Sequence, residues 1–244
     1  MVYFILTLII CAVCGYLLGS INTSLIVGKF YKIDVRNYGS GNAGATNVLR
    51  TLGKKAALFT FIGDFLKGVA ACLAGAGIVL LVMNVFGDGV FGNSIFGYIL
   101  SGAELRHIPA QSGLMAAGAA CVVGHNWPLY FGFKGGKGVL TTFSVFLMMA
   151  PVPALITLVF FVLVVALTRY VSLSSMLAAM FLPIFVFVTY LLGWDVGVEN
   201  IRTYLIFCVP LVVLVVVRHK KNIKKLLNGT ENKLNFKKVK GGIE

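Results

Sequence analysis

Long apolar stretches alternate with short polar segments along almost the whole chain. A helix needs about 20 apolar residues to cross the hydrocarbon core of a bilayer. Stretches of about this length cover residues 3–28, 56–83, 111–131, 139–168, 173–192 and 201–217. The pattern therefore predicts an all-α, polytopic integral membrane protein, with residues 1–244 forming one membrane domain.

The stretch 139–168 can form one long helix or two short ones. It contains Pro151-Val152-Pro153, and proline interrupts helices because it lacks an N–H and clashes with the preceding turn. Only a hairpin places the basic segment 29–55, Lys134 with Lys137, and the basic tail on one side, as the Lys/Arg bias of cytoplasmic loops requires. We therefore expect about seven transmembrane helices, with the amino terminus outside and the carboxyl terminus in the cytoplasm. Each helix of this hairpin would be only about 20 Å long, which is short for a hydrocarbon core of about 30 Å. The two helices must therefore start early, thin the bilayer or enter it without crossing.

Composition agrees with a membrane protein and narrows its partners. The chain is 59% hydrophobic and 12% charged, with a mean hydropathy of +0.93, which excludes an ordinary soluble domain. The net charge of +13 is concentrated in loops and tail, which indicates anionic membrane lipids as partners, not nucleic acid. The five cysteines are scattered through apolar runs, so we expect no metal site and no cofactor.

The first polar cluster, residues 36–50, combines small residues with hydroxyls, amides and a terminal guanidinium. Such a segment suits an oxyanion or a phosphate, although an ordinary turn before a helix would have a similar composition. Polar groups are costly at a membrane face, which favours a functional site. The candidate residues are Ser40, Gly41, Asn42, Thr46, Asn47 and Arg50.

The second cluster is a Gly-rich loop that follows His125. Glycines allow close backbone approach to a phosphate, and lysines neutralise its charge. It is not a Walker A loop, because Gly138 stands where Ser or Thr belongs and Phe131 where the first Gly belongs. A histidine near a helix end, such as His125, is more often structural than catalytic. The candidates here are Lys134, Gly135, Gly136, Lys137 and Gly138.

The third cluster lies in the basic tail. As a charge run it would anchor the chain to a membrane surface. His219 and Asn222 are three residues apart, however, and share a helix face. Glu231 is the only acid near this stretch before the carboxyl-terminal residue, and we expect it to pair with a cation and fix the loop more than to act as a base.

Together these clusters resemble the three motifs of the bacterial PlsY-type acyltransferases. The matching segments are GSGNAGATNVLR at 39–50, GHNWP at 124–128 with FKGGKGV at 133–139, and RHKKNI at 218–223 with GTE at 229–231. The likeness extends to Gly19-Ser20-Ile21, Asp64 with Lys67-Gly68, and 170–175. Two positions depart from the family pattern: Leu140 replaces an expected alanine and could narrow the pocket, and Asn22 stands where proline is frequent.

The resemblance implies transfer of a fatty acyl group from acyl phosphate to glycerol 3-phosphate, giving lysophosphatidic acid in the first acylation step of phospholipid synthesis. It implies a multi-pass protein of the cell membrane with its site facing the cytoplasm. Arg50 and Lys137 would be the leading charge partners of two phosphates. Ser40, Asn42, Thr46 and Asn47 would line the oxyanion or acyl-phosphate hole, and His219 and Asn222 would hold the glycerol phosphate. Substrate would also meet Ser172, Ser175 and Glu231.

An acyl phosphate is an activated anhydride, so positioning and electrostatic stabilisation can suffice, with a substrate phosphate accepting the proton. A covalent mechanism through Ser40 is the rival, and it lacks a nearby base in sequence. The alternative function is a transporter or channel for an anionic metabolite, which predicts ionisable residues deep in the spans, where mainly Asp64 and Lys67 are found. A membrane-surface scaffold is a third possibility, but it would not need Ser, Asn and Thr grouped with Arg.

Overall fold

The computed structural model describes residues 2–86, 108–194 and 201–234, and every regular element in this part is a helix. The long helices are α1 (Val2–Ser20), α4 (Lys54–Phe86), α6 (Ile108–Asn126), α8 (Pro151–Thr168), α9 (Val171–Leu191) and α10 (Ile201–Arg218). The shorter elements are α2 (Thr23–Phe30), η1 (Val35–Asn37), α3 (Ala45–Leu52), η2 (Leu129–Phe131), α7 (Val139–Met149) and α11 (Lys220–Leu227).

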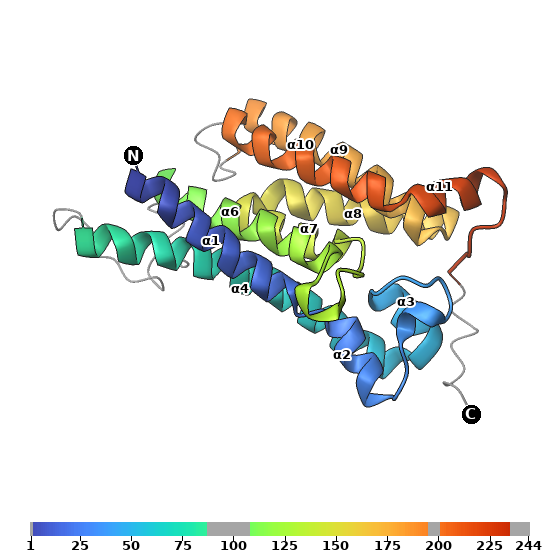
Figure 1. Ribbon diagram of the computed structural model, residues 1–244. Helices are drawn as coiled ribbons and strands as arrows, with labels where there is room; N and C mark the ends of the chain where they lie inside the picture. Colours follow the sequence, from blue (N-terminus) through green and yellow to red (C-terminus); the bar gives the residue numbers. More distant parts are fainter. Residues whose placement is uncertain (1, 87–107, 195–200, 235–244) are drawn as a thin grey trace.

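The long helices lie side by side, with α2, α3 and α11 grouped at one end of the bundle (Figure 1). Helices α6 and α7 lie between α1 and α4 on one side and α8 to α10 on the other (Figure 1). Four segments are long and apolar enough to cross a membrane: Ile5–Phe30, Lys54–Val85, Pro151–Thr168 and Val171–Leu191. Helix α7 and the segment Tyr204–Arg218 of α10 are shorter apolar helices.

Glycines set the close packing of the first three long helices. A Cβ atom at Gly15 would lie 2.1 Å from the carbonyl oxygen of Ala117, and one at Gly19 would lie 2.1 Å from that of Cys121. Both contacts advance in the same direction, so α1 and α6 run parallel. Gly75 of α4 meets Gly113 of α6 in the same way, at 2.2 Å. Small residues let membrane helices approach closely where apolar burial supplies no driving force.

The predicted hairpin in 139–168 is present. Helix α7 ends at Met149 and α8 begins at Pro151, so the chain breaks at Ala150, where the Pro-x-Pro segment interrupts the helix. The beginning of α7 lies at the end of the bundle where α11 lies, because Lys137 Nζ, just before α7, donates to Asn222 Oδ1 of α11. The end of α8 lies at the same end, since Leu234 N donates to the carbonyl oxygen of Arg169. The two arms therefore run in opposite directions.

Two predicted stretches differ in detail from the helices. The stretch 3–28 matches the candidate span Ile5–Phe30, but the helix breaks between Ser20 and Thr23, where the Asn22 side chain caps α2 by accepting from Leu25 N. The stretch predicted to end at residue 131 leaves the helix at Asn126, after which Pro128 opens a short turn. At the first break the Asn22 side chain accepts from a free backbone amide, and at the second the backbone carbonyl oxygen of Asn126 accepts from Gly135 N.

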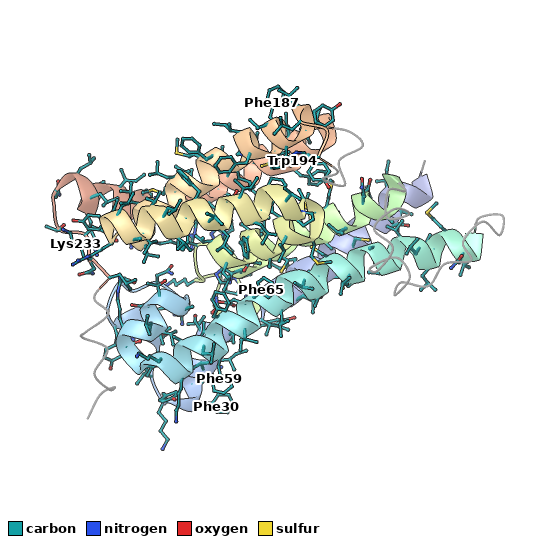
Figure 2. The ribbon with its side chains drawn as sticks, turned by 180° about the vertical axis from the view of Figure 1, so that it is seen from behind. Phe30, Phe59, Phe65, Phe187, Trp194 and Lys233 are labelled. Atoms are coloured by element: carbon teal, nitrogen blue, oxygen red, sulfur yellow. The ribbon has the colours of Figure 1, made fainter. Side chains whose placement is uncertain are left out.

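Most basic residues of the described part lie in the loops and helix ends at the α3 end of the bundle, whereas Lys67 lies within α4 and Arg202 near the beginning of α10. Those at the α3 end are Lys29, Lys32, Arg36, Arg50, Lys54, Lys55, Lys134, Lys137, Arg169, Arg218, Lys220, Lys221, Lys224, Lys225 and Lys233. The predicted topology places Asp88, Glu104, Asp195 and Glu199 on the opposite side of the membrane, and these residues lie outside the described part of the chain. This clustering is what a cytoplasmic face would present, while the orientation in the cell stays a prediction. Apolar side chains cover much of the outer surface, and Figure 2 shows Phe30 and Phe59 projecting outward near this end.

Candidate active site

A cavity of about 320 Å³ opens at the end of the bundle where the three polar clusters meet. Its walls come from α3 and the loop before it, from the beginning of α7, from α8 and α9, and from the segment between α10 and residue 231. The fold thus brings together three motifs that lie far apart in the sequence.

Twelve of the sixteen predicted site residues line this cavity. They are Ser40, Asn42, Thr46, Asn47, Arg50, Lys137, Gly138, Ser172, Ser175, His219, Asn222 and Glu231. The other four, Gly41, Lys134, Gly135 and Gly136, are not among its lining residues.

Asn47 holds the first motif in shape. Its Oδ1 atom accepts from the amide N of Ser40 at 2.8 Å and from Ser40 Oγ at 3.1 Å. Its Nδ2 group donates to the carbonyl oxygens of Val35 at 2.8 Å and Tyr38 at 3.1 Å. The amide is 1% exposed and both its N–H groups are used by the loop, so it positions Ser40 beside the cavity.

Helix α3 begins directly after this loop. Gly44 occupies the cap position without a side-chain hydrogen bond, and Gly44, Ala45 and Thr46 all line the cavity. The first amides of a helix lack intrahelical partners and carry its positive dipole end. Together with Arg50 one turn later, they offer a setting for an anion.

Two arginines hold the Gly-rich loop from opposite sides. Arg36 pairs with Asp34 at 2.7 Å and donates through Nη1 to the carbonyl oxygens of Phe131 at 3.1 Å and Lys134 at 3.0 Å. The Arg36 guanidinium also lowers the pKa of the Asp34 carboxyl. Arg218 donates to the carbonyl oxygen of Gly136 at 2.7 Å through Nη2 and at 3.2 Å through Nε. Both arginines therefore act as loop clamps.

The Gly-rich loop was expected to bring its backbone close to a phosphate, but the two central glycines serve packing. Gly135 N donates to the carbonyl oxygen of Asn126 at 3.2 Å, and Gly136 N donates to that of His125 at 3.1 Å. A Cβ at Gly135 would lie 2.1 Å from the same His125 oxygen. These amides are engaged with the end of α6, and the cavity receives Lys137 and Gly138 instead.

A chain of hydrogen bonds joins the second and third motifs. Lys137 Nζ donates to Asn222 Oδ1 at 2.6 Å, and Asn222 Nδ2 donates to Glu231 Oε1 at 2.8 Å. Ser172 Oγ donates to the same oxygen at 2.8 Å. Arg50 Nη2 approaches the carbonyl oxygen of Asn232 at 3.4 Å. Residues 228–234 thereby tie α11 to both α3 and α9 at the cavity.

Burial lowers the pKa values of two side chains at the cavity, Lys137 and His219. It lowers the pKa of Lys137 to about 8, while the Glu231 carboxylate opposes the shift and the neighbouring cations add to it. Burial also lowers the pKa of His219 to about 4, so its ring is neutral at pH 7. His219 Nδ1 lies 2.7 Å from the Val215 carbonyl oxygen, which can only accept a hydrogen bond. The proton therefore sits on Nδ1, and Nε2 is an acceptor.

Beneath the loops lies a buried charge cluster of Asp64, Lys67 and His125. Lys67 Nζ lies 2.8 Å from Asp64 Oδ1 and 2.9 Å from His125 Nδ1. Asp64 and His125 line the cavity. The i, i+3 spacing of Asp64 and Lys67 could be recognised in the sequence, but the contact with His125 depends on the packing of α4 against α6. His125 is at once structural, as expected, and accessible from the cavity.

The cavity also has an apolar part that the sequence did not reveal. Its lining includes Phe61, Phe143, Phe146, Ala154, Leu158, Phe161, Ala178, Ala179 and Leu182. Ser172, Ser175, Ala179 and Leu182 follow one another at helical spacing, so α9 presents a stripe that changes from polar to apolar over roughly 15 Å. In sequence such a stripe cannot be distinguished from an ordinary helix-packing face. Leu140 also lines the cavity, so its bulk does face this space.

Among the described residues, no group of three or more His, Cys, Asp or Glu is arranged to hold a metal ion. The residues that line the cavity supply cationic, amide and hydroxyl groups at its mouth and apolar groups deeper in the bundle. Such a site can hold anions beside an aliphatic chain. Fold and site together define the class, an integral membrane protein with a site suited to amphipathic, anionic lipid chemistry.

Residues 9–229 match the family model described as glycerol-3-phosphate acyltransferase. The glycerol-3-phosphate acyltransferase of Clostridioides difficile (strain 630) is 43% identical over 236 residues, covering 96% of this chain and 98% of that protein. The one from Alkaliphilus metalliredigens (strain QYMF) is 41% identical over 226 residues, covering 92% of this chain and 95% of that protein. The chain belongs to the glycerol-3-phosphate acyltransferase family, and the resemblance seen in the three motifs is confirmed.

Solved structures agree with this assignment. The crystal structure of PlsY (YgiH), an integral membrane glycerol 3-phosphate acyltransferase, in its glycerol 3-phosphate form is 33% identical, with a TM-score of 0.70. The match covers 95% of this chain and 98% of that one. The lysphosphatidic acid form of the same protein is 32% identical, with a TM-score of 0.68 over 95% and 97% of the two chains.

Proposed function

We propose that this protein transfers a fatty acyl group from acyl phosphate to glycerol 3-phosphate, releasing lysophosphatidic acid and inorganic phosphate. One observation carries the proposal: a single cavity combines the cations Arg50 and Lys137 at its mouth with an apolar extension between α7, α8 and α9. Two phosphorylated substrates, one of them with an acyl chain, match these two parts. The relatives named for glycerol 3-phosphate, and the solved forms with glycerol 3-phosphate and lysphosphatidic acid, support the same substrate class.

The two phosphates are proposed to bind to different cations. Arg50 lines the cavity together with the first residues of α3, and arginine can grip two phosphate oxygens at once. Lys137 is held by Asn222 and faces the Glu231 side of the cavity. Asn42 and Thr46 complete the first of these subsites, and Ser172, Ser175 and Asn222 the second.

His219 suits the hydroxyl of glycerol 3-phosphate better than its phosphate. Its ring is neutral and its free Nε2 accepts a hydrogen bond, which would orient an O–H group towards the acyl carbon. A pKa of about 4 makes it a weak base. In the proposed step the hydroxyl oxygen forms the new C–O bond, the bond between acyl carbon and phosphate oxygen breaks, and the leaving phosphate takes both the electron pair and the hydroxyl proton.

A covalent route through Ser40 receives no support from its surroundings. Its hydroxyl lies 3.1 Å from Asn47 Oδ1, an amide oxygen that cannot act as a base. In the described part of the chain, no His, Asp or Glu side chain is hydrogen-bonded to Ser40. Direct transfer needs only alignment and charge stabilisation, because the anhydride is already activated.

We place the site on the cytoplasmic side of the cell membrane. The basic loops around the cavity support this orientation, since cytoplasmic loops carry excess Lys and Arg. Both proposed phosphorylated substrates would be supplied from that compartment, and anionic headgroups would add attraction.

Incubating the purified protein in detergent with labelled glycerol 3-phosphate and either acyl phosphate or acyl-CoA tests the proposal. We expect lysophosphatidic acid from acyl phosphate alone, with chelator present and without ATP. Arg50→Ala, whose turnover at low substrate concentration should be strongly reduced, serves as the matched control. Robust turnover with acyl-CoA and none with acyl phosphate would refute the assignment of the donor.

A further inference from the structure

The ammonium group of Lys67 is surrounded by three acceptors. Nζ lies 2.8 Å from Asp64 Oδ1, 3.0 Å from the carbonyl oxygen of Ile21 and 2.9 Å from His125 Nδ1. The side chains of Asp64, Lys67 and His125 are all at least nine-tenths buried. A lysine ammonium has three N–H donors and no lone pair; here it is hydrogen-bonded to Ile21 and His125, and its contact with Asp64 is an ion pair.

This arrangement fixes the tautomer of His125. Because the Lys67 ammonium can only donate, His125 Nδ1 must accept and carries no proton. The neutral imidazole then has its proton on Nε2, which becomes a hydrogen-bond donor. His219 has the opposite arrangement, since its Nδ1 donates to a carbonyl oxygen. The cavity is therefore lined by one histidine whose Nε2 donates and another whose Nε2 accepts.

The Nε2–H group of His125 faces a space kept open by a glycine. A Cβ at Gly136 would lie 2.2 Å from Nε2 and 2.5 Å from the carbonyl oxygen of Ala43. The atom thus lies between the first motif and the Gly-rich loop, at the wall of the cavity. Nε2 has no hydrogen-bond partner among the described residues. Because His125 lines the cavity and Nε2 is not among the sealed, unpaired polar atoms, a hydrogen-bond acceptor on a bound ligand can pair with this donor.

We propose that His125 Nε2–H donates a hydrogen bond to the carbonyl oxygen of the acyl donor and stabilises the oxyanion formed when the glycerol hydroxyl attacks. The inference rests on the proposed function above. A neutral donor suits an oxygen that gains charge only in the transition state, whereas the cations at the cavity mouth suit phosphates. Electrons move from the attacking hydroxyl to the carbonyl oxygen and return as the phosphate leaves. Asp64 and Lys67 are positioning residues that keep the proton on Nε2.

The tautomer can be read without turnover. The chain has three histidines, His107, His125 and His219, so long-range ¹H–¹⁵N spectra of protein labelled at histidine contain three ring systems, assignable by single substitutions. We expect an Nε2–H tautomer for His125 and an Nδ1–H tautomer for His219. In Lys67→Met the proton of His125 should move to Nδ1. Asp64 Oδ1 lies 3.6 Å from this atom in the unmodified protein and becomes its nearest partner once the ammonium is removed. An Nδ1–H tautomer of His125 in the unmodified protein would overturn the proposal.

Kinetics then separate a hydrogen-bond donor from a packing residue. His125→Gln keeps an N–H group near the position of Nε2, whereas His125→Phe keeps the ring shape without it. We expect kcat to fall about 100-fold in His125→Phe, the range seen for loss of one oxyanion donor, with little change in KM for glycerol 3-phosphate. His125→Gln should retain activity within about 10-fold of the unmodified protein.

Equal activity, or equal impairment, of the Gln and Phe variants would contradict the proposal, because a structural role would not distinguish them. Melting temperatures in detergent show whether each variant is folded. If the unmodified protein had no activity with acyl phosphate, the proposed function would fail, while the tautomer result would still stand on its own.

Discussion

The burial of Lys137 limits the pH range over which its side chain is charged. Its ammonium is held by Asn222 Oδ1, and burial brings its pKa to about 8. Below this value the group is charged and can attract a phosphate; above it the charge is lost. The Glu231 charge favours the charged form of Lys137, although its Oε1 atom accepts hydrogen bonds from Ser172 and Asn222 and makes no direct ion pair among the described residues.

The kcat/KM for glycerol 3-phosphate should therefore fall as the pH rises through about 8, because this ratio reports ionisations of the free enzyme. Glu231→Gln keeps the hydrogen-bond acceptor but removes the negative charge, so the alkaline limb should move to lower pH. Lys137→Arg is the control: it stays charged, and the limb near pH 8 should disappear. An unchanged limb in Lys137→Arg would show that another group titrates.

At the scale of elements, the loop before α3 and the helix itself form one unit held by Asn47. Four hydrogen bonds from this side chain reach Val35, Tyr38 and Ser40. Asn42 lines the same cavity, but its side chain makes no hydrogen bond to the described residues. The two asparagines look equivalent in the sequence, yet one fixes the loop and the other faces the substrate space.

Replacing each asparagine by alanine should separate these roles. Asn47→Ala should lower the free energy of unfolding by roughly 1–3 kcal/mol, the cost of leaving buried polar groups unpaired, and should lower activity as well. Asn42→Ala should lower activity with an unchanged melting temperature. Thermal unfolding in detergent and steady-state rates on the same preparations provide the measurement. A larger loss of stability in Asn42→Ala would contradict the division.

Much of the helix pattern could be predicted from apolar length and from the Lys/Arg distribution. The break in 139–168 is an example, because Pro151 and Pro153 mark it and because only a hairpin keeps the basic tail on the same side as the other basic loops. Helix ends were less predictable: Asn22 and Asn126 sit inside or beside apolar runs, and only tertiary packing decides that the helices stop there. The motifs indicated most of the polar residues that line the cavity, since polar groups at a membrane face signal use.

What the sequence could not show depends on contacts between distant segments. The carbonyl oxygens of His125 and Asn126 accept hydrogen bonds from the backbone amides of the Gly-rich loop. The glycines expected to approach a phosphate therefore allow close packing against the end of α6. The clamping roles of Arg36 and Arg218 likewise follow from carbonyl groups about a hundred residues away along the chain.

On the scale of the whole molecule, the bundle is polar at one end, and apolar side chains cover much of its sides. All the loops that line the cavity meet at the end where α2, α3 and α11 gather (Figure 1). Phe65 of α4, labelled in Figure 2, packs against Phe143 of α7, which lines the cavity, with ring centroids 6.2 Å apart.

Single cysteines in a cysteine-free background should report the orientation. We expect replacements at Gly41 and Gly229, both exposed, to react with an impermeant reagent only from the cytoplasmic side. A replacement at Gly89, outside the described residues, should react from the outside. Reaction of Gly41 and Gly229 from opposite sides would contradict both the seven-helix topology and the shared cavity.

The most direct test of the active site is steady-state kinetics of Arg50→Ala and Lys137→Ala, with each substrate varied in turn. Losing a charge-assisted hydrogen bond costs roughly 1.5–3 kcal/mol, or about 10- to 150-fold in a rate or binding constant. If the two cations hold different phosphates, each variant should raise the KM for one substrate by about this factor while remaining folded. Arg50→Lys should stay impaired because the planar fork is lost. Near-unmodified kcat/KM for both substrates in Arg50→Ala would show that the cavity is not the active site.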